Sequence, residues 1–233
     1  MSIIHSSELI LGIDSATRGG SVALARGDEI LGALEGDPTG TQSTQALGQI
    51  REILDANGLT LVDVDRIAVT IGPGSFTGLR IGIATAKGLA ATLGCAVAAV
   101  PTLYAVARSA GVPGSIVALI PAGRNEVFAQ RLRVNVDGAI EELTPPDHLP
   151  LPQLIELCGG IESLTWASVA GANYTDAVMA AGFSNWHVTP PTVNLAVNVI
   201  QVAQAGGRES TPTDLTAMYV RLSDAELKLR CQP

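Results

Sequence analysis

The sequence contains the same pattern of short apolar runs twice, and this repeat limits the folds that the chain can adopt. Three apolar runs separated by polar turns open each half: 9–13, 21–25 and 29–35 in the first, and 116–120, 126–134 and 139–143 in the second. The two copies are offset by about 107 residues, counted from Asp14 to Pro121. Short apolar runs bounded by turn residues predict β-strands, and Arg26-Gly27-Asp28 predicts a hairpin turn. Each half is therefore expected to open with three successive antiparallel strands.

Further elements follow these strands in both halves. Helical periodicity predicts helices at 41–57, 77–93, 102–110, 152–158, 175–181 and 194–205, with a short final helix at 225–229. Further strands are expected at 64–71, 96–100 and 165–170. This arrangement indicates the α/β class and a duplicated actin-like (ribonuclease-H-like) fold, with two lobes that each hold a mixed sheet flanked by helices. The expected lobes are residues 1–105 and 106–233, with the last segment returning to the N-terminal lobe.

Composition restricts the classes of function. Hydrophobic residues make up 47% of the chain and charged residues 15%, so a substantial core can form. The net charge is −8 and no cluster of Lys and Arg occurs, which argues against a direct grip on nucleic acid. The three cysteines are far apart, which fits a reducing cytoplasmic compartment rather than a disulfide framework. Neither a signal peptide nor a membrane-spanning segment is expected, because Lys87 interrupts the most apolar stretch, 81–100.

The segment Gly72-Pro73-Gly74-Ser75-Phe76-Thr77-Gly78-Leu79-Arg80-Ile81-Gly82 is the most distinctive motif. It should lead from a strand through a tight turn into a helix that the hydroxyl of Ser75 or Thr77 caps. Gly78 and Gly82 are four residues apart, a spacing that lets another backbone approach the helix. The loop can therefore meet a phosphate or a partner helix, or it can be a structural turn that needs glycine. The lysine of a phosphate-binding Walker loop does not follow it.

Residue types that carry metal or nucleophilic chemistry are sparse. The histidines, His5, His148 and His187, lack the spacing that would place two imidazoles on one helix face, and we expect all three at the surface. No Gly-x-Ser-x-Gly sequence marks a nucleophilic serine. Cys95 stands at the start of an apolar strand and is expected in the core. The residues therefore indicate a chain without a metal or catalytic centre of its own.

The motif at 72–82 is similar to the signature of the TsaB (YeaZ) family along its whole length. Four further segments resemble that family in the same order. They are Leu11-Gly12-Ile13-Asp14-Ser15-Ala16-Thr17, Gly123-Arg124-Asn125-Glu126-Val127-Phe128, Val169-Ala170-Gly171-Ala172-Asn173 and Tyr219-Val220-Arg221. The resemblance thus extends over nearly the whole chain, although only the first motif is specific by itself.

The resemblance implies the two-lobed actin-like fold and a non-catalytic role. TsaB proteins pair with TsaD, a larger paralogue that carries a metal and transfers threonylcarbamoyl to the adenosine beside the anticodon of tRNA. TsaE, a small ATPase, joins them, and TsaB proteins also form homodimers through the helices of the N-terminal lobe. By this resemblance the chain needs no cofactor and meets tRNA only through the complex.

The resemblance and the pattern of small residues together suggest a partner-facing surface. We expect it to comprise residues of the first long helix and of the signature: Ser43, Leu47, Ile50, Gly74, Ser75, Phe76, Thr77, Gly78, Arg80 and Ile81. Arg80 is the expected polar or tRNA contact, or else the partner of a carboxylate. Phe76 is expected to anchor the loop in the core.

Two positions depart from the family pattern. Ser43 stands where the family often has histidine, and Pro121 stands where it has aspartate, which removes a carboxylate from the place where actin-like proteins hold the magnesium shell of a nucleotide. Asp14 remains in the first lobe, and Asp14 and Ser15 are candidate nucleotide contacts, although an aspartate after a strand is more often a turn residue. Binding of ATP with magnesium is thus expected only weakly or at a shared interface.

Two other functions stay open. An independent phosphotransferase or a glycoprotease-like hydrolase is compatible with the fold. The second alternative is a self-associating regulator, whose homodimer covers the face that would otherwise meet a partner.

Overall fold

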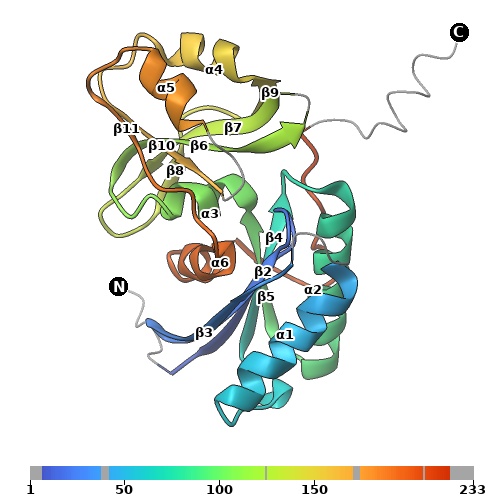
Figure 1. Cartoon of the computed structure of the whole chain (residues 1–233). Helices are drawn as coiled ribbons and strands as arrows, with labels where there is room; N and C mark the ends of the chain where they lie inside the picture. The colour runs from blue at the N-terminus through green and yellow to red at the C-terminus, as the bar shows by residue number, and fades with distance from the viewer. Residues whose placement is uncertain (1–6, 38–41, 124, 170–173, 207, 221–233) are drawn as a thin grey trace, which may run out of the picture.

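The computed structural model describes residues 7–37, 42–123, 125–169, 174–206 and 208–220, which form two lobes (Figure 1). The sheet of the N-terminal lobe contains β1 (Leu9–Asp14), β2 (Ser21–Arg26), β3 (Glu29–Glu35), β4 (Arg66–Gly72), β5 (Ala96–Pro101) and β12 (Arg208–Ser210). The sheet of the C-terminal lobe contains β6 (Gly114–Gly123), β7 (Glu126–Val134), β8 (Ile140–Glu142), β10 (Leu164–Ser168) and β11 (Trp186–Val188), while β9 (Asp147–Pro150) pairs with β7.

Both sheets have the same strand order, which confirms the predicted duplication. The order is β5-β4-β1-β2-β3 in the first sheet, extended by β12, and β11-β10-β6-β7-β8 in the second. In each lobe the first three strands form an antiparallel meander, and a later strand, β4 or β10, runs parallel to the first. This is the order of a duplicated ribonuclease-H-like unit, as expected for the actin-like class.

Helices cover both outer faces and fill the space between the sheets (Figure 1). On the outer face of the first sheet, α1 (Gln42–Ala56) packs on β2 and β3, and α2 (Phe76–Leu93) packs mainly on β4, and both bury apolar side chains there. On the outer face of the second sheet, α4 (Leu151–Cys158) and α5 (Thr175–Ala180) do the same. Between the sheets lie α3 (Thr102–Arg108) and α6 (Leu195–Gln204), surrounded by a core cluster to which both sheets contribute.

The two central helices exchange lobes. Helix α3 follows the first sheet in sequence but packs mainly on β6, β7 and β10, whereas α6 follows the second sheet and packs mainly on β1 and β2. The N–H of Ala196 in α6 donates to Ser21 Oγ (3.0 Å), and a Cβ added at Gly12 would lie only 2.6 Å from the carbonyl oxygen of Ala196. Each lobe therefore depends on a helix supplied by the other half of the chain.

After α6 the chain returns to the N-terminal lobe. Strand β12 pairs antiparallel with β5 at the edge of the first sheet. Arg66 of β4 forms ion pairs with Glu8 (3.0 Å) and Glu209 (3.3 Å), and the N–H of Met218 donates to the carbonyl of Ile71 (2.7 Å). The segment 208–219 thus lies against the edge and the end of the first sheet.

An aromatic stack links the surface of the C-terminal lobe to its core. Phe183 stacks on Trp186 with ring centroids 4.2 Å apart, and Trp186 lies 5.2 Å from Trp166. Both indoles are buried, with 1% of Trp166 and 3% of Trp186 exposed. Trp186 Nε1 donates to the carbonyl of Ile161 (3.1 Å), whereas Trp166 Nε1 has no hydrogen-bond partner among the described residues.

Several sequence predictions need correction. Strand β6 continues through Pro121 to Gly123, where a turn was expected, because irregular pairing with β7 after Pro121 accommodates a residue without an N–H. Strands β9, β11 and β12 were not predicted. Cys95, expected in the core, is only partly buried at its edge, where burial raises the pKa of its thiol. The expected helix at 225–229 lies outside the described residues.

Among the described helices, none combines the length and the apolar character that crossing a membrane requires.

Candidate functional site

The end of β1 carries a buried carboxylate that holds the following turn together. Asp14 Oδ1 accepts hydrogen bonds from the N–H of Ala16 (2.9 Å) and from the hydroxyl of Thr70 (3.1 Å). Its Oδ2 accepts a further bond from the hydroxyl of Thr17. Burial has the largest effect on this group and raises its pKa above 3.8, although the hydrogen bonds act in the opposite direction. Asp14 therefore fixes the 14–17 turn against β4.

Ser15 fits into a notch on α2 that glycine creates. A Cβ added at Gly82 would lie 2.0 Å from Ser15 Oγ and 2.8 Å from Ser15 Cβ. The N–H of Ser15 donates to Thr70 Oγ1 (3.2 Å), which holds the serine in place. Its hydroxyl is buried and has no hydrogen-bond partner among the described residues. Gly82 thus allows α2 to lie directly on the turn that follows β1.

Two glycines of the signature loop sit where a side chain would meet a carbonyl oxygen. Gly72 has a φ of 117°, and its Cβ would lie 2.3 Å from the carbonyl oxygen of Met218. Gly74 has a φ of 155°, and its Cβ would lie 2.5 Å from the carbonyl oxygen of Ala16. Both positions combine a positive φ with a close backbone approach, so only glycine fits without strain.

Ser75 begins α2, which settles the choice between the two predicted caps. Its N–H donates to the carbonyl of Ala16 (2.8 Å), and its Oγ accepts the N–H of Gly78 (3.1 Å). Ser75 is therefore the N-cap, and Thr77 lies exposed in the first turn of the helix. The signature loop is tied to the β1–β2 turn on one side and to the C-terminal segment on the other.

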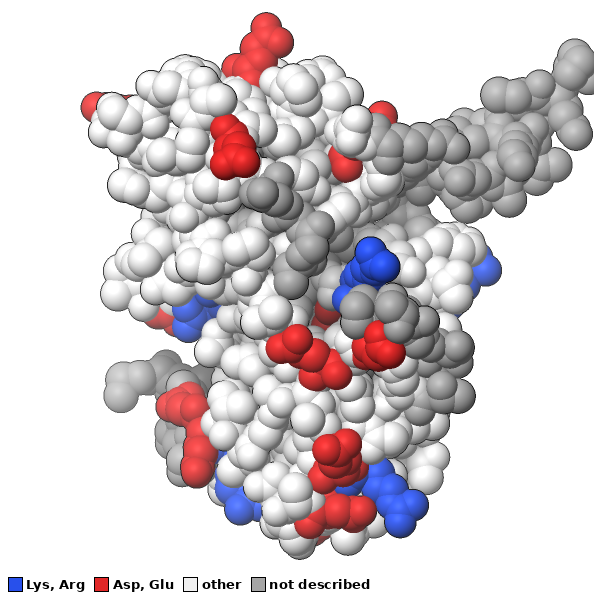
Figure 2. Space-filling model, viewed as in Figure 1, with Lys and Arg blue, Asp and Glu red and all other residues white. Residues whose placement is uncertain are grey.

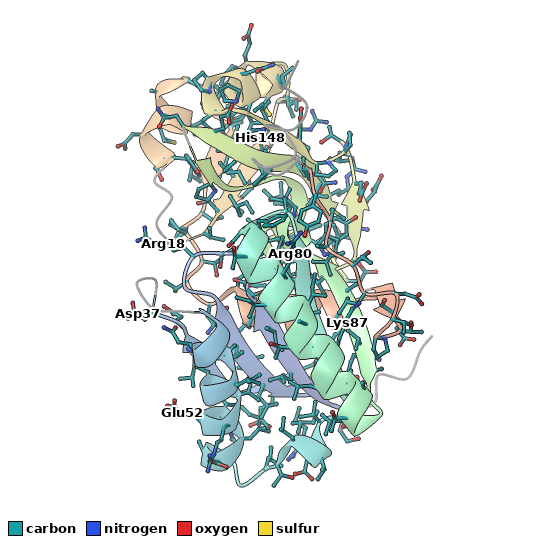
Figure 3. The ribbon with its side chains drawn as sticks, turned by 90° about the vertical axis from the view of Figure 1, so that its right-hand side faces the viewer. Arg18, Asp37, Glu52, Arg80, Lys87 and His148 are labelled. Carbon is teal, nitrogen blue, oxygen red and sulfur yellow. The ribbon has the colours of Figure 1, made fainter. Side chains whose placement is uncertain are left out.

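Three large side chains form an exposed cluster at the start of α2. The guanidinium of Arg80 lies over the ring of Phe76, 3.8 Å from its centroid, and Arg80 Nε donates to the hydroxyl of Tyr219 (3.3 Å). The rings of Phe76 and Tyr219 are 5.3 Å apart. Figure 3 places Arg80 at the upper end of α2, on the face turned toward the viewer. We call Phe76, Arg80 and Tyr219 the arginine cluster.

The cluster corrects one prediction and adds a residue that sequence reasoning missed. Phe76 does not anchor the loop in the core, since 38% of it is exposed and it packs on Tyr219. Tyr219 was noted only as part of a family motif, because its sequence position gives no sign that it lies beside α2.

The other predicted interface residues differ in their exposure. Leu47 is 53% exposed on α1, and Ser75 and Thr77 are exposed on the signature segment, while Gly74 and Ile81 are partly covered. Ile50 is buried in the core of its own lobe, so its assignment to a partner surface is wrong. Gly78 is also buried and acts through its hydrogen bond to Ser75. Ser43 belongs to α1, but its side chain lies outside the described part.

The residues at the actin-like nucleotide position do not fit a magnesium–nucleotide shell. The oxygens of Asp14 accept hydrogen bonds from the turn and from β4, and Pro121, the corresponding residue near the end of β6, carries no carboxylate. Within the residues that the structure describes, no three or more His, Cys, Asp and Glu side chains are grouped so that they could hold a metal ion.

The two described histidines lie on different strands, His148 on β9 and His187 on β11. His148, predicted at the surface, is largely covered, with 18% of its side chain exposed, because its Nε2 lies 2.9 Å from Glu126 Oε2 and its ring packs on Phe128. His187 is exposed on β11, and His5 lies outside the described residues.

Asp14→Asn should change how stability depends on pH. Burial raises the pKa of Asp14 in the folded chain, so the folded state holds this proton more tightly than the unfolded state. The stability from this group is complete below its unfolded pKa and is lost as pH rises through the folded pKa. Asparagine does not titrate. The free energy of unfolding of the variant minus that of the parent chain should therefore increase as pH rises above about 4, the pKa of an aspartate in the unfolded chain.

Asp63→Asn provides a control of opposite sign for this titration. Hydrogen bonds from Thr60 lower the pKa of Asp63, so its contribution is present above the unfolded pKa and is lost as pH falls through the folded pKa. For Asp63→Asn, the free energy of unfolding of the variant minus that of the parent chain should decrease as pH rises. Denaturant titrations between about pH 3 and pH 8 measure both differences. A flat difference for Asp14→Asn would contradict the assignment of Asp14 as a desolvated carboxylate.

Sequence comparisons relate this chain to proteins of tRNA threonylcarbamoyladenosine biosynthesis. The family model described as TsaD, tRNA N6-adenosine threonylcarbamoyltransferase, matches residues 41–179, which is more than half of the chain. The tRNA threonylcarbamoyladenosine biosynthesis protein TsaB of Escherichia coli is 36% identical over 122 residues, which cover 51% of this chain and 52% of that protein. TsaB of Haemophilus influenzae is 38% identical over 132 residues, covering 54% and 55%, respectively. TsaB of Bacillus subtilis is 28% identical over 149 residues, covering 64% and 65%. The matches thus span about half to two thirds of the length of these three TsaB proteins.

Solved structures match over most of the chain. YeaZ from Pseudomonas aeruginosa aligns with a TM-score of 0.71 at 25% identity, covering 91% of this chain and 99% of that one. The activator of 2-hydroxyisocaproyl-CoA dehydratase from Clostridium difficile, solved with bound ADPNP, aligns with a TM-score of 0.53 at 10% identity, covering 97% and 98%. At that identity the second match supports the actin-like fold alone.

Proposed function

Because this chain belongs to the TsaB (YeaZ) family, within the group that the TsaD model describes, we propose that it is a non-catalytic accessory subunit of tRNA threonylcarbamoyladenosine biosynthesis. In this role it pairs with TsaD, and TsaE joins the complex, which transfers threonylcarbamoyl to the adenosine beside the anticodon. The proposal places the protein in the cytoplasm and gives it no cofactor of its own. ATP with magnesium would bind only weakly or at an interface shared with a partner.

The contacts of the signature residues support this proposal most directly. Gly72, Gly74 and Gly82 admit neighbouring parts of the same chain, and Ser75 caps α2. These residues build a fixed loop and helix rather than a ligand pocket. What the segment offers outward is a helical surface together with the arginine cluster, as expected for a protein whose role is to be bound.

Two exposed glycines on the outer helices support a helix-packing partner. A Cβ at Gly48 of α1 or Gly88 of α2 would meet no atom within 4 Å. Glycine inside a helix costs about 1 kcal/mol relative to alanine, and no contact with the described residues requires it at these two positions. Close approach by a helix of a second protein would explain both. Leu47, exposed beside Gly48, supplies apolar area for the same contact.

The charge distribution supports an indirect relation to tRNA. On the face shown in Figure 2, Lys and Arg side chains are few and scattered, and acidic side chains lie among them. With a net charge of −8, the chain carries more acidic than basic side chains, which opposes the neutralisation of several phosphates at once. In the proposed complex another subunit therefore holds the tRNA.

The direct test is a sizing and pull-down experiment with the cognate TsaD, with and without ATP. A stable one-to-one complex, together with the absence of transferase and protease activity in the isolated chain, supports the proposal. Robust activity without any partner, or tight binding of Mg-ATP that Asp14→Ala abolishes, would favour an independent enzyme instead. A homodimer through the same helices should compete with TsaD as the protein concentration rises.

Gly88→Gln should separate folding from partner binding. The new side chain enters open space, so thermal stability should be unchanged or slightly raised, while affinity for TsaD should fall at least about tenfold through steric exclusion. Ala177→Gln, at an exposed position of α5 on the other lobe, is the matched control and should leave affinity unchanged. Isothermal titration calorimetry of both variants measures the effect. Equal affinities for the two variants would remove α2 from the proposed interface.

A further inference from the structure

We propose that the arginine cluster is a contact site for a carboxylate of the partner protein, with Arg80 as the binding group and Tyr219 as the residue that positions it. This inference rests on the proposed function for the identity of the partner. It adds the chemistry of the contact and a residue from the C-terminal segment.

The guanidinium of Arg80 is held in place before any partner arrives. It lies 3.8 Å above the centre of the Phe76 ring, and its Nε is bound to the hydroxyl of Tyr219 at 3.3 Å. Stacking on a ring and one hydrogen bond restrict a side chain that otherwise loses considerable rotamer freedom on binding. A guanidinium fixed in this way binds a planar acceptor at a lower entropic cost.

The outward part of Arg80 is available for binding. Within the described part of the chain, no ion pair involves this residue, and its only hydrogen bond there is the one to Tyr219. The two terminal nitrogens match the two oxygens of a carboxylate, which is the planar acceptor that arginine binds bidentately. The site therefore provides one oriented cation with unused donors.

The composition of the cluster favours a protein partner. Tyrosine and arginine dominate the residues that carry binding energy in protein interfaces, where they are surrounded by apolar contacts. Aromatic residues make up only 3% of this chain, yet 38% of Phe76 and 48% of Tyr219 remain exposed. A partner that covers the rings of Phe76 and Tyr219 and pairs a carboxylate with Arg80 would gain affinity from both contacts.

An RNA phosphate fits the surroundings less well. Binding of nucleic acid needs several phosphates neutralised at once, and the chain has 22 acidic against 14 basic residues. The next cation along the helix is Lys87, about two turns away from Arg80 (Figure 3). A single isolated guanidinium suits one carboxylate on a folded surface.

The test uses the full chain and full-length TsaD, with dissociation constants measured by calorimetry. Arg80→Ala should weaken binding about 30-fold, and Arg80→Lys should weaken it about tenfold, because lysine neither stacks flat nor binds bidentately. Tyr219→Phe, which keeps the ring and removes the hydroxyl, should weaken binding about three- to tenfold. Arg80→Glu should bind more weakly than Arg80→Ala, because two carboxylates would then meet. Arg133→Ala removes an exposed cation from the other lobe and should stay within about twofold of the parent chain.

Each outcome bears on one of the two proposals. The three substituted side chains, Arg80, Tyr219 and Arg133, are exposed, so thermal unfolding of each of the five variants should move by no more than about 2 °C, and circular dichroism confirms folding. If the parent chain does not bind TsaD, the proposed function falls and this inference falls with it. If the parent chain binds but Arg80→Ala stays within twofold, or if Arg80→Glu equals Arg80→Ala, the inference is wrong and the proposed function stands. Loss of tRNA binding by Arg80→Ala with unchanged TsaD affinity, measured by fluorescence anisotropy, would assign the cluster to RNA and overturn the inference.

Discussion

Replacing Gly82 with valine should lower the free energy of unfolding by about 3 kcal/mol, because the new side chain would occupy the space of Ser15. A Cβ at this position lies 2.0 Å from Ser15 Oγ and 2.8 Å from Ser15 Cβ, so rotation of the hydroxyl alone cannot relieve the overlap. Helix α2 would have to move away from the β1–β2 turn. Urea denaturation followed by circular dichroism measures the loss.

A second substitution and a control make this prediction specific. Ser15→Gly removes both overlapping atoms and should restore at least half of the lost stability in the double variant, whereas Ser15→Ala leaves the Cβ and should restore less. Gly88→Val, on the same helix but with no atom within 4 Å of its Cβ, should cost nothing. If Gly88→Val is as destabilising as Gly82→Val, crowding of the β-branched side chain within α2, rather than overlap with Ser15, explains the effect.

Trp166→Ala should destabilise the protein by about 4 kcal/mol, the largest effect that we predict for one substitution. The indole is 1% exposed and packs on Trp186 in the core of the C-terminal lobe, so its removal leaves a large cavity.

Because α3 and α6 join both sheets in one core cluster, we expect a single unfolding transition in calorimetry. Two separate transitions would contradict the mutual dependence of the lobes.

The contribution of one hydrogen bond to stability can be measured by comparing Trp→Phe substitutions at the two tryptophans. Trp186→Phe loses the bond to the carbonyl of Ile161, while Trp166→Phe loses none among the described residues. Both variants keep an aromatic ring in the stack and lose similar volume. Trp186→Phe should therefore be more destabilising by about 1 kcal/mol. Equal losses would mean that the bond to Ile161 contributes nothing net.

The sequence predicted the elements whose own residues determine them. The strands of both meanders and the helices α1, α2, α3 and α6 were placed within a few residues, because long apolar runs and helical periodicity are local signals. Two of the missed strands, β9 and β12, consist of residues that do not favour a strand. Strand β9 is Asp147-His148-Leu149-Pro150 and β12 is Arg208-Glu209-Ser210, and both form through pairing with β7 and β5.

The candidate site was predicted only where it is built from neighbours in sequence. The signature loop, its cap and the need for glycine follow from local turn chemistry. The contact of Arg80 with Tyr219 joins residues 139 positions apart, and no periodicity signals such a contact. Ile50 was assigned to the partner surface and Phe76 to the core because an apolar side chain in an amphipathic segment does not reveal which neighbour covers it.

The exchange of α3 and α6 has a consequence for synthesis on the ribosome. When the first 105 residues have emerged, the inner face of the first sheet still lacks α6, and its outer edge lacks β12. Apolar residues of that face, such as Ile10, Ala23 and Ala68, therefore stay uncovered in the nascent chain until residues 195–204 follow. The first lobe therefore cannot complete its folding during synthesis before the second sheet and α6 have been made. We expect the two lobes to reach their final packing together.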